Sequence, residues 1–401
     1  QNVAVGNAAL NAMNPATATN MYNTAVGASA GLAVTTGLNN TLIGGLAGDA
    51  ITASNDNVAV GTAALTTNTL SSENVAIGRS ALQELNHTTA TDGFNVAVGS
   101  DAGKLVTTGT NNTLIGGLAG DALTDADLNV AVGDNALSAD TLGSRSTAIG
   151  RSALSSQNFT TATDTYNTAV GFNAGTAVTT GTKNVLIGAL AGDALTNSEQ
   201  NVAVGYGALS SETLGINSTA IGNNALENQN LATAADSFNV AVGVNAGNGI
   251  TTGVNNTLLG ALAGDALTDA DHNTAVGRGS LGADTLGSRA VAVGFGALSS
   301  QNFTTATDNY NVAVGFNAGV LVSTGTNNTL IGGLAGDALT DADLNVAVGD
   351  NALSADTLGS RSTAIGRSAL SSQNFTTATD TYNTAVGFNA GTAVTTGREN
   401  T

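Results

Sequence analysis

Asn167-Thr168-Ala169-Val170-Gly171 is one copy of the five-residue unit that decides the fold of this chain. The pattern Asn-[Val/Thr]-[Ala/Leu]-[Val/Ile/Leu]-Gly can be placed 22 times between Asn2 and Gly387, with Ser or Ala replacing Asn in four copies. Successive closing glycines lie 21, 17, 17 and 17 residues apart, and this series repeats to the last copy. Four steps make 72 residues, so a short repeat is nested within a longer one. Self-similarity at a fixed period indicates a solenoid or a related repeat architecture.

The residue choice within the unit predicts a short β-strand. Its second position is always Val or Thr and its fourth is always Val, Ile or Leu, and β-branched residues at a period of two are typical of strands. The position between them is always Ala or Leu, so we expect a strand buried on both faces. We expect the second and fourth side chains to face the interior and the Ala or Leu to meet a neighbouring chain.

Two further positions predict how each coil turns. The closing glycine is constant, and because glycine accepts positive φ and permits close approach we predict a corner there; examples are Gly27, Gly44, Gly61, Gly78, Gly99 and Gly171. The leading Asn fits two interpretations: it stacks and hydrogen-bonds with its copy in the next coil, or it tolerates a turn conformation. Three residues after the glycine comes Ala, or Ser280 once, then Gly or Leu, which predicts a second short strand or a bend.

A strand, a glycine corner and a second strand or bend in each repeat describe one rung of an all-β parallel β-solenoid, a β-roll or β-helix. We predict 22 coils of 17 or 21 residues, which at about 4.8 Å per rung would stack over about 105 Å. Residues 1–401 are expected to form a single continuous array that is a segment of a longer protein. With 52 Gly, one Pro, no Cys and no Trp, the composition suits a thin interior of small aliphatic residues.

Charge and composition exclude several functions. The formal net charge is −19 with only ten basic residues, which argues against nucleic acid as a partner because phosphate contacts need clustered Lys and Arg. No apolar run approaches the roughly 18 residues of a membrane span, so we expect no direct membrane insertion of this segment. His87 and His272 each occur once among the repeats, and no Ser-His-Asp set or phosphate-binding loop is found. We therefore predict that the chain is not an enzyme.

The stretch Ser146-Thr147-Ala148-Ile149-Gly150-Arg151-Ser152-Ala153 resembles the head repeats of YadA-like trimeric autotransporter adhesins, and the resemblance covers essentially the whole chain. It implies a left-handed parallel β-roll, three chains side by side, a bacterial surface location, and binding to host matrix or to other cells. Similar arrays are found in phage tail fibres and in tail-fibre-like surface proteins. The repeat here is longer than that family's usual one, so wider loops are expected on one side of each coil.

One aromatic residue precedes the motif once in every 72 residues, and the set is Tyr22, Phe94, Tyr166, Phe238, Tyr310 and Tyr382. Successive members are four rungs apart, roughly 19 Å, which is too far for ring stacking. Two interpretations remain: each ring packs against the 21-residue loop, or the rings form a repeated contact site for glycans or a partner surface.

Acidic residues recur in the second coil of three blocks. Oxygen ligands close together can hold Ca²⁺, so calcium is a candidate ligand beside the alternative of solvated acidic turns; the candidate residues are Asp121, Asp125, Asp127, Asp265, Asp269, Asp271, Asp337, Asp341 and Asp343. No other cofactor is expected.

The leading functional hypothesis is a structural and adhesive extracellular fibre that mediates attachment to a host or cell-surface protein or glycan, or spaces a distal binding element. A homotrimer or a homo-oligomeric filament is the expected assembly, and the cell or virion surface is the expected location. The alternatives are a phage tail or capsid fibre shaft and a self-assembling extracellular filament. Because the pentapeptide is scaffold in each case, recognition is expected in the variable loops, above all the 21-residue ones.

Overall fold

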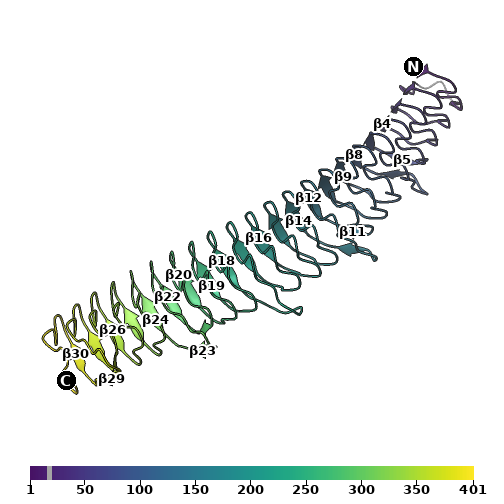
Figure 1. Cartoon of the computed structure of the whole chain (residues 1–401). Helices are drawn as coiled ribbons and strands as arrows, with labels where there is room; N and C mark the ends of the chain where they lie inside the picture. The colour runs from purple at the N-terminus through teal and green to yellow at the C-terminus, as the bar shows by residue number, and fades with distance from the viewer. Residues whose placement is uncertain (16–19) are drawn as a thin grey trace. The chain divides into compact units, whose positions relative to one another are not determined.

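The computed structural model describes residues 1–15 and 20–401 of the chain. Over these residues it contains strands and turns and no helix, so the predicted all-β class is confirmed. The chain divides into two compact units, Gln1–Gln200 and Asn201–Thr401. Each unit is a parallel β-solenoid whose coils follow one another every 17 or 21 residues, and about 22 turns are made in all. Figure 1 shows the strands of each unit stacked in chain order.

Each main strand is three residues long and forms positions two to four of the pentapeptide. In the described part of the first unit these strands are β1 (Val3–Val5), β2 (Thr24–Val26), β3 (Thr41–Ile43), β4 (Val58–Val60), β6 (Val75–Ile77), β8 (Val96–Val98), β9 (Thr113–Ile115), β10 (Val130–Val132), β12 (Thr147–Ile149), β14 (Thr168–Val170) and β15 (Val185–Ile187). In the second unit they are β16 (Val202–Val204), β17 (Thr219–Ile221), β18 (Val240–Val242), β19 (Thr257–Leu259), β20 (Thr274–Val276), β22 (Val291–Val293), β24 (Val312–Val314), β25 (Thr329–Ile331), β26 (Val346–Val348), β28 (Thr363–Ile365) and β30 (Thr384–Val386).

The main strands pair in parallel, motif position against motif position. Ala131 of β10, for example, lies beside Ala148 of β12. Two-residue strands form separate pairs along another edge of the coils (Figure 1). These pairs are β5 (Ser71–Ser72) with β7 (Thr91–Asp92), β11 (Gly143–Ser144) with β13 (Thr163–Asp164), β21 (Gly287–Ser288) with β23 (Thr307–Asp308), and β27 (Gly359–Ser360) with β29 (Thr379–Asp380). The two-residue strands lie farther along the coil; the stretch directly after each closing glycine is a turn, so the predicted bend is found there and not a second strand.

Each main strand inside the stack buries its central residue and leaves the flanking ones accessible. In β12, Ala148 is fully buried, Thr147 is half-buried and Ile149 is 37% exposed. The prediction that the strand is buried on both faces, with the second and fourth side chains inward, is therefore wrong. The interior is thin enough that Ala fills it in most rungs, whereas β-branched side chains stack along the outside and cover one another's flanks.

The interior of the coils combines large and small residues, and one coil in each 72-residue block has a central Leu where the other three have Ala. Leu114 takes the central strand position and lies between two turn glycines. A Cβ on Gly103 would lie 2.6 Å from Cδ1 of this leucine, and one on Gly120 would lie 2.8 Å from its Cδ2. The next two coils have a central Ala instead, and their turns carry the buried Leu137 and Leu154 where these glycines stand. Each leucine thus fills space that the neighbouring coils leave, as close packing requires.

A ladder of buried asparagines runs along the leading positions of the motif. The backbone N–H and side-chain amide of Asn112 both donate to Oδ1 of Asn95, at 3.0 and 3.2 Å. Oδ1 of Asn112 accepts from the backbone N–H of Asn129 at 3.0 Å, and its amide donates to the carbonyl of Ala126 at 2.8 Å. The stacking interpretation is confirmed. The turn conformation belongs instead to the preceding residue, for example Asn111 with φ of 59°.

The closing glycines form the corners that the sequence predicts. The six named above have φ between 135° and 147°, a region that other residues rarely adopt. A Cβ on Gly133 would lie 2.6 Å from the carbonyl carbon and oxygen of Gly150 in the next coil. Each corner therefore needs glycine for its conformation and for the approach of the adjacent backbone.

Candidate functional site

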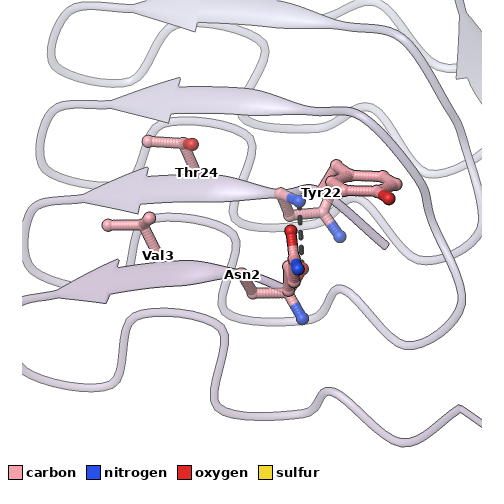
Figure 2. Close-up of a pocket in the computed structure, with 6 residues that line it drawn as sticks. Asn2, Val3, Tyr22 and Thr24 are labelled. Atoms are coloured by element: carbon pink, nitrogen blue, oxygen red, sulfur yellow. Dashed lines mark hydrogen bonds between the residues drawn. The ribbon is translucent and has the colours of Figure 1, made fainter. Parts of the chain in front are cut away.

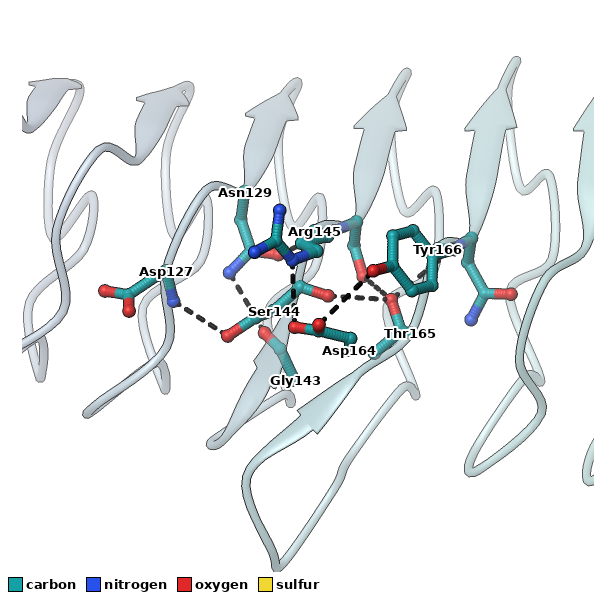
Figure 3. Close-up of polar contacts among 10 residues, drawn as sticks. Asp127, Asn129, Gly143, Ser144, Arg145, Asp164, Thr165 and Tyr166 are labelled. Atoms are coloured by element: carbon teal, nitrogen blue, oxygen red, sulfur yellow. Dashed lines mark hydrogen bonds and ion pairs between the residues drawn. The ribbon is translucent and has the colours of Figure 1, made fainter.

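The extra four residues of the long coils place an arginine, an aspartate and a tyrosine together on the surface (Figure 3). Arg145 follows β11, and its Nε lies 3.0 Å from Oδ1 of Asp164 at the end of β13. The hydroxyl of Tyr166 donates to the other carboxylate oxygen at 3.3 Å, and the guanidinium carbon lies 6.0 Å from the centre of the tyrosine ring. The same cluster recurs as Arg289, Asp308 and Tyr310, and as Arg361, Asp380 and Tyr382.

The six periodic aromatic residues are exposed. Their exposed fractions run from 51% to 55%, so each ring is about half covered and half open to solvent, and both interpretations stay predictions. All six adopt the left-handed backbone conformation immediately before a motif, with φ from 48° to 53°. The ladder asparagine that follows each aromatic residue is buried inside the coil, as Asn167 is after Tyr166, whereas the aromatic ring lies outside. The exposure that a contact site requires is present, and the contact itself stays a prediction.

The surface clusters contribute little to folding. Asp308 raises the pKa of the Arg289 guanidinium through a hydrogen bond and its charge. Both partners are about half exposed, and exposed ion pairs of this kind stabilise proteins only weakly because water and salt screen them. These side chains are therefore features of the loop surface and do not determine the fold.

A buried polar network in the long coils was not predicted from the sequence. Gln157 donates to Oδ2 of Asp140 at 2.6 Å and to Oγ of Ser146 at 2.8 Å, and its Oε1 accepts from the Asn167 amide at 2.8 Å. All four side chains are buried. Ser146 stands where the ladder has Asn, so the glutamine restores the contact that the shorter serine loses. The available signal was the pairing of each exceptional Ser with Gln eleven residues later, at 146/157, 218/229 and 362/373.

The acidic residues predicted as calcium ligands do not converge. Oδ1 of Asp125 accepts from the Thr108 hydroxyl at 2.5 Å, and Oδ1 of Asp127 accepts from the Thr110 backbone N–H at 2.6 Å. Both contacts reach back to the preceding coil, and the equivalent carboxylates repeat them, namely Asp269, Asp271, Asp341 and Asp343. Within residues 1–15 and 20–401, no three acidic or histidine side chains are placed to hold a metal ion.

Asp121 and its equivalents are separate from these surface contacts. In the described structure Oδ1 of Asp121 is buried without a hydrogen-bond partner, and the same holds for the equivalents Asp49, Asp193, Asp265 and Asp337. Burial raises the pKa of all five carboxyls. The pKa of these carboxyls in the folded chain lies above the unfolded value of 3.8. Between the unfolded and the folded pKa the folded chain holds more protons, so the free energy of unfolding falls as the pH rises through that range.

We therefore expect Asp121→Asn to raise the urea midpoint at pH 7, since the substitution removes the cost of a partly buried charge. The gain should shrink as the pH is lowered towards 3.8, where the parent aspartate becomes protonated. Urea unfolding followed by circular dichroism at several pH values measures both effects. Asp125→Asn, at an exposed position, is the control for loss of one charge. A lower midpoint for Asp121→Asn at pH 7 would show that the ionised carboxylate stabilises the fold.

Two cavities lie beside the first and last strands of the described structure. One, of about 400 Å³, is lined in part by Val3, Tyr22 and Thr24. Figure 2 shows Val3 and Thr24 on the same face of neighbouring strands, next to the hydrogen bond from the Asn23 N–H to Oδ1 of Asn2. The other, of about 320 Å³, is lined in part by residues of β30. Neither lining contains a carboxylate or imidazole side chain.

A further continuous feature of each unit is what we call the outer strand face, formed by the second and fourth motif positions of its main strands. Thr147 and Ile149 are its members in β12. Every residue of the face is Val, Thr, Ile or Leu, so it carries no charge in a chain of net charge −19. Its isoleucines remain 37% to 39% exposed. Extended apolar surfaces of this kind mark sites of interaction.

No known family model matches the chain, and a search of curated proteins finds no significantly similar sequence. Over the described residues, the structure contains no helix long and apolar enough to span a membrane. The candidate sites are therefore the outer strand face and the loop surface, and the geometry of this chain alone supports them.

Proposed function

We propose that this chain is a structural segment of an extracellular attachment fibre, located on a cell or virion surface and assembled from several copies. The observation that carries the proposal is the unbroken stack of rungs in each unit. In the described part of the chain, the main strands pair rung to rung, and the corner glycines and interior leucines pack against neighbouring rungs. Such quasi-one-dimensional stacks provide length and many equivalent surface positions, which suits avidity from repeated weak contacts.

We propose the outer strand face as the contact between copies. Copies with a net charge of −19 repel one another, and this face offers uncharged strips where two chains can approach. Its β-branched side chains are regular in spacing and rigid, so their burial costs little side-chain entropy. The resemblance to trimeric adhesins suggests three copies, and the mass of the purified chain tests that number. A monomer at high protein concentration would contradict the proposed assembly.

Charges placed on the outer strand face are expected to separate the copies. The variant, called here the triple-Asp variant, changes three outward isoleucines at one position of the 72-residue period: Ile77→Asp, Ile149→Asp and Ile221→Asp. Burying these carboxylates against a second uncharged face is costly, so sedimentation should report a monomer with an unchanged circular dichroism spectrum. The matched control adds the same charge at exposed loop positions, by Thr88→Asp, Thr160→Asp and Thr304→Asp, and should keep the parent mass. Equal masses for the two variants would contradict this interface.

A further inference from the structure

A third cavity interrupts the regular surface of the second unit. Its volume is about 330 Å³, and its lining residues belong to the turns that follow β19, β20, β22 and β24. Figure 1 labels these strands. Apolar and polar side chains both line the cavity, and they are Leu262, Phe295, Val320, Arg278, Ser299 and Asn317. Small-molecule sites commonly have this size and this combination of an apolar wall with a few polar groups. Because all these residues belong to the second unit, the cavity does not depend on a partner chain.

Two glycines line the cavity. The second residue after the corner glycine is Asn in several coils, for example Asn245 with φ of 56° and Asn317 with φ of 50°. Three coils lie between these two; Leu262 holds the position in the first, and Gly279 and Gly296, both with φ of 65°, hold it in the next two. A Cβ on Gly279 would meet no atom within 4 Å. The backbone conformation accepts Asn at both positions. Gly279 therefore leaves space that an Asn side chain would fill, whereas a Cβ on Gly296 would lie 2.5 Å from Oδ1 of Asn317.

Phe295 forms one wall, and its ring stacks on that of Phe316 outside the lining. The rings of Phe295 and Phe316 lie 5.5 Å apart at 13° to one another. The guanidinium carbon of Arg278 lies 5.9 Å from the centre of the Phe295 ring, on the preceding coil. Both phenylalanines remain about half exposed, at 47% and 56%. Exposed rings of this kind offer an apolar face or edge to a flat ligand.

The guanidinium of Arg278 lacks the carboxylate that its counterparts have. Elsewhere an arginine over a phenylalanine is joined by an aspartate of the preceding coil, as with Arg151 and Asp134 at 3.8 Å, and in the identical repeat with Arg367 and Asp350 at 3.4 Å. At the cavity that aspartate position is Ala261. Among the described residues, no carboxylate lies within ion-pair distance of Arg278.

We propose that this cavity binds a six-membered ring that carries a carboxylate, as found in an acidic sugar residue of a glycan. The ligand carboxylate takes the place of the missing aspartate on Arg278, where the planar guanidinium can bind it with two hydrogen bonds. The ring packs against Phe295, and the side chains of Ser299 and Asn317 are available to its hydroxyl groups. This inference rests on the proposed attachment function and gives that function a ligand.

The test compares methyl glucuronide with methyl glucoside, which differ by the carboxylate, in ligand-observed NMR with the full chain. We expect the glucuronide to bind about tenfold more tightly, because its carboxylate adds one charge-assisted contact with Arg278. Benzoate distinguishes an acidic sugar from an aromatic acid. Equal affinity for the two glycosides would overturn the role of Arg278, and binding of benzoate without the glucuronide would overturn the assignment to a sugar.

Two variants locate the site without changing the arginine. Ala261→Asp places the protein's own carboxylate beside Arg278, as Asp134 lies beside Arg151, and should weaken glucuronide binding about tenfold. Its control, Ala189→Asp, adds the same charge at the equivalent turn position of a coil that Tyr206 follows instead of an arginine, and should bind as the parent does. Gly279→Asn should fill the cavity and abolish binding, whereas Gly207→Asn, at the same coil position away from it, should not. Unchanged binding in Ala261→Asp and Gly279→Asn would overturn the proposal.

The ligand test and the assembly test can fail separately. Glucuronide binding is measured on the triple-Asp variant as well as on the parent, because the cavity residues belong to one unit of one chain. Binding by a monomeric variant supports the ligand site even if the parent proves monomeric and the proposed fibre is wrong. An assembled parent that fails to bind the glucuronide overturns the ligand proposal alone.

Discussion

Gly116→Ala is expected to destabilise the solenoid by at least about 3 kcal/mol, because it combines backbone strain with an atomic overlap. Gly116 has φ of 139°, and a Cβ there would lie 2.5 Å from the carbonyl carbon of Gly133 in the next coil. The adjacent backbone cannot move away without breaking its own hydrogen bonds, such as the one from the Gly133 N–H to the Ile115 carbonyl at 2.7 Å. Urea unfolding followed by circular dichroism measures the loss in the free energy of unfolding.

The control for this prediction is the neighbouring residue. Gly117 lies outside the positive-φ region, and the nearest atom to its added Cβ is the exposed Asp134 Oδ1 at 3.3 Å. That side chain can rotate away, so Gly117→Ala should change the free energy of unfolding by less than about 0.5 kcal/mol. Hydrogen exchange should show lost protection around β9 and β10 only for Gly116→Ala. Similar midpoints for the two variants would contradict the corner geometry.

Asn112→Ala is expected to cost about 3 kcal/mol, since it leaves buried backbone groups without partners. The N–H of Asn129 loses its acceptor and the carbonyl of Ala126 loses its donor, and both bonds are buried. An unfilled buried donor or acceptor costs more than a mean hydrogen bond contributes, because water cannot replace the lost partner. The unfolding midpoint and the exchange rate of the Asn129 amide proton measure the two consequences.

The adjacent Asn111 provides the control, because it is exposed and adopts the left-handed conformation with φ of 59°. Asn111→Gly keeps that conformation accessible and removes only an amide that donates to the Thr110 hydroxyl at 3.0 Å. The free energy of unfolding of this variant should stay within about 0.5 kcal/mol of the parent value. If Asn112→Ala were as mild as Asn111→Gly, the ladder would be incidental to stability.

The period and the glycine corners were predictable because they depend on local rules. Gly133 needs a conformation that only glycine adopts freely, and the spacing of its copies counts the coils directly. The orientation of the strand was not predictable, because Thr147, Ala148 and Ile149 are compatible with either face being inside. Side-chain volume decides: the stacked coils leave room for Ala or an occasional Leu, and that room depends on the turn glycines of adjacent coils.

The candidate sites were predictable only in part. The position of Tyr166 in a long loop could be read from the period, but its exposure depends on the backbone conformation before the ladder asparagine. The cavity beside Arg278 was not predicted, although its signals are visible in the sequence. They are Ala261 one coil before Arg278, whereas Asp134 and Asp350 stand one coil before Arg151 and Arg367, and Gly279 and Gly296 at a position where several other coils have Asn. Only the stacking of successive coils shows that these departures lie together.

Background-free cysteine labelling tests the central claim, that the outer strand face is made of the β-branched residues while Ala and Leu fill the interior. The chain contains no cysteine, so Ala347→Cys and Val348→Cys each introduce one thiol at neighbouring positions of β26. In the triple-Asp variant, which is expected to be a monomer, the thiol at 348 should react rapidly with a maleimide. The thiol at 347 should react only under unfolding conditions, because Ala347 is fully buried. Rapid labelling at 347 with protection at 348 would contradict the account.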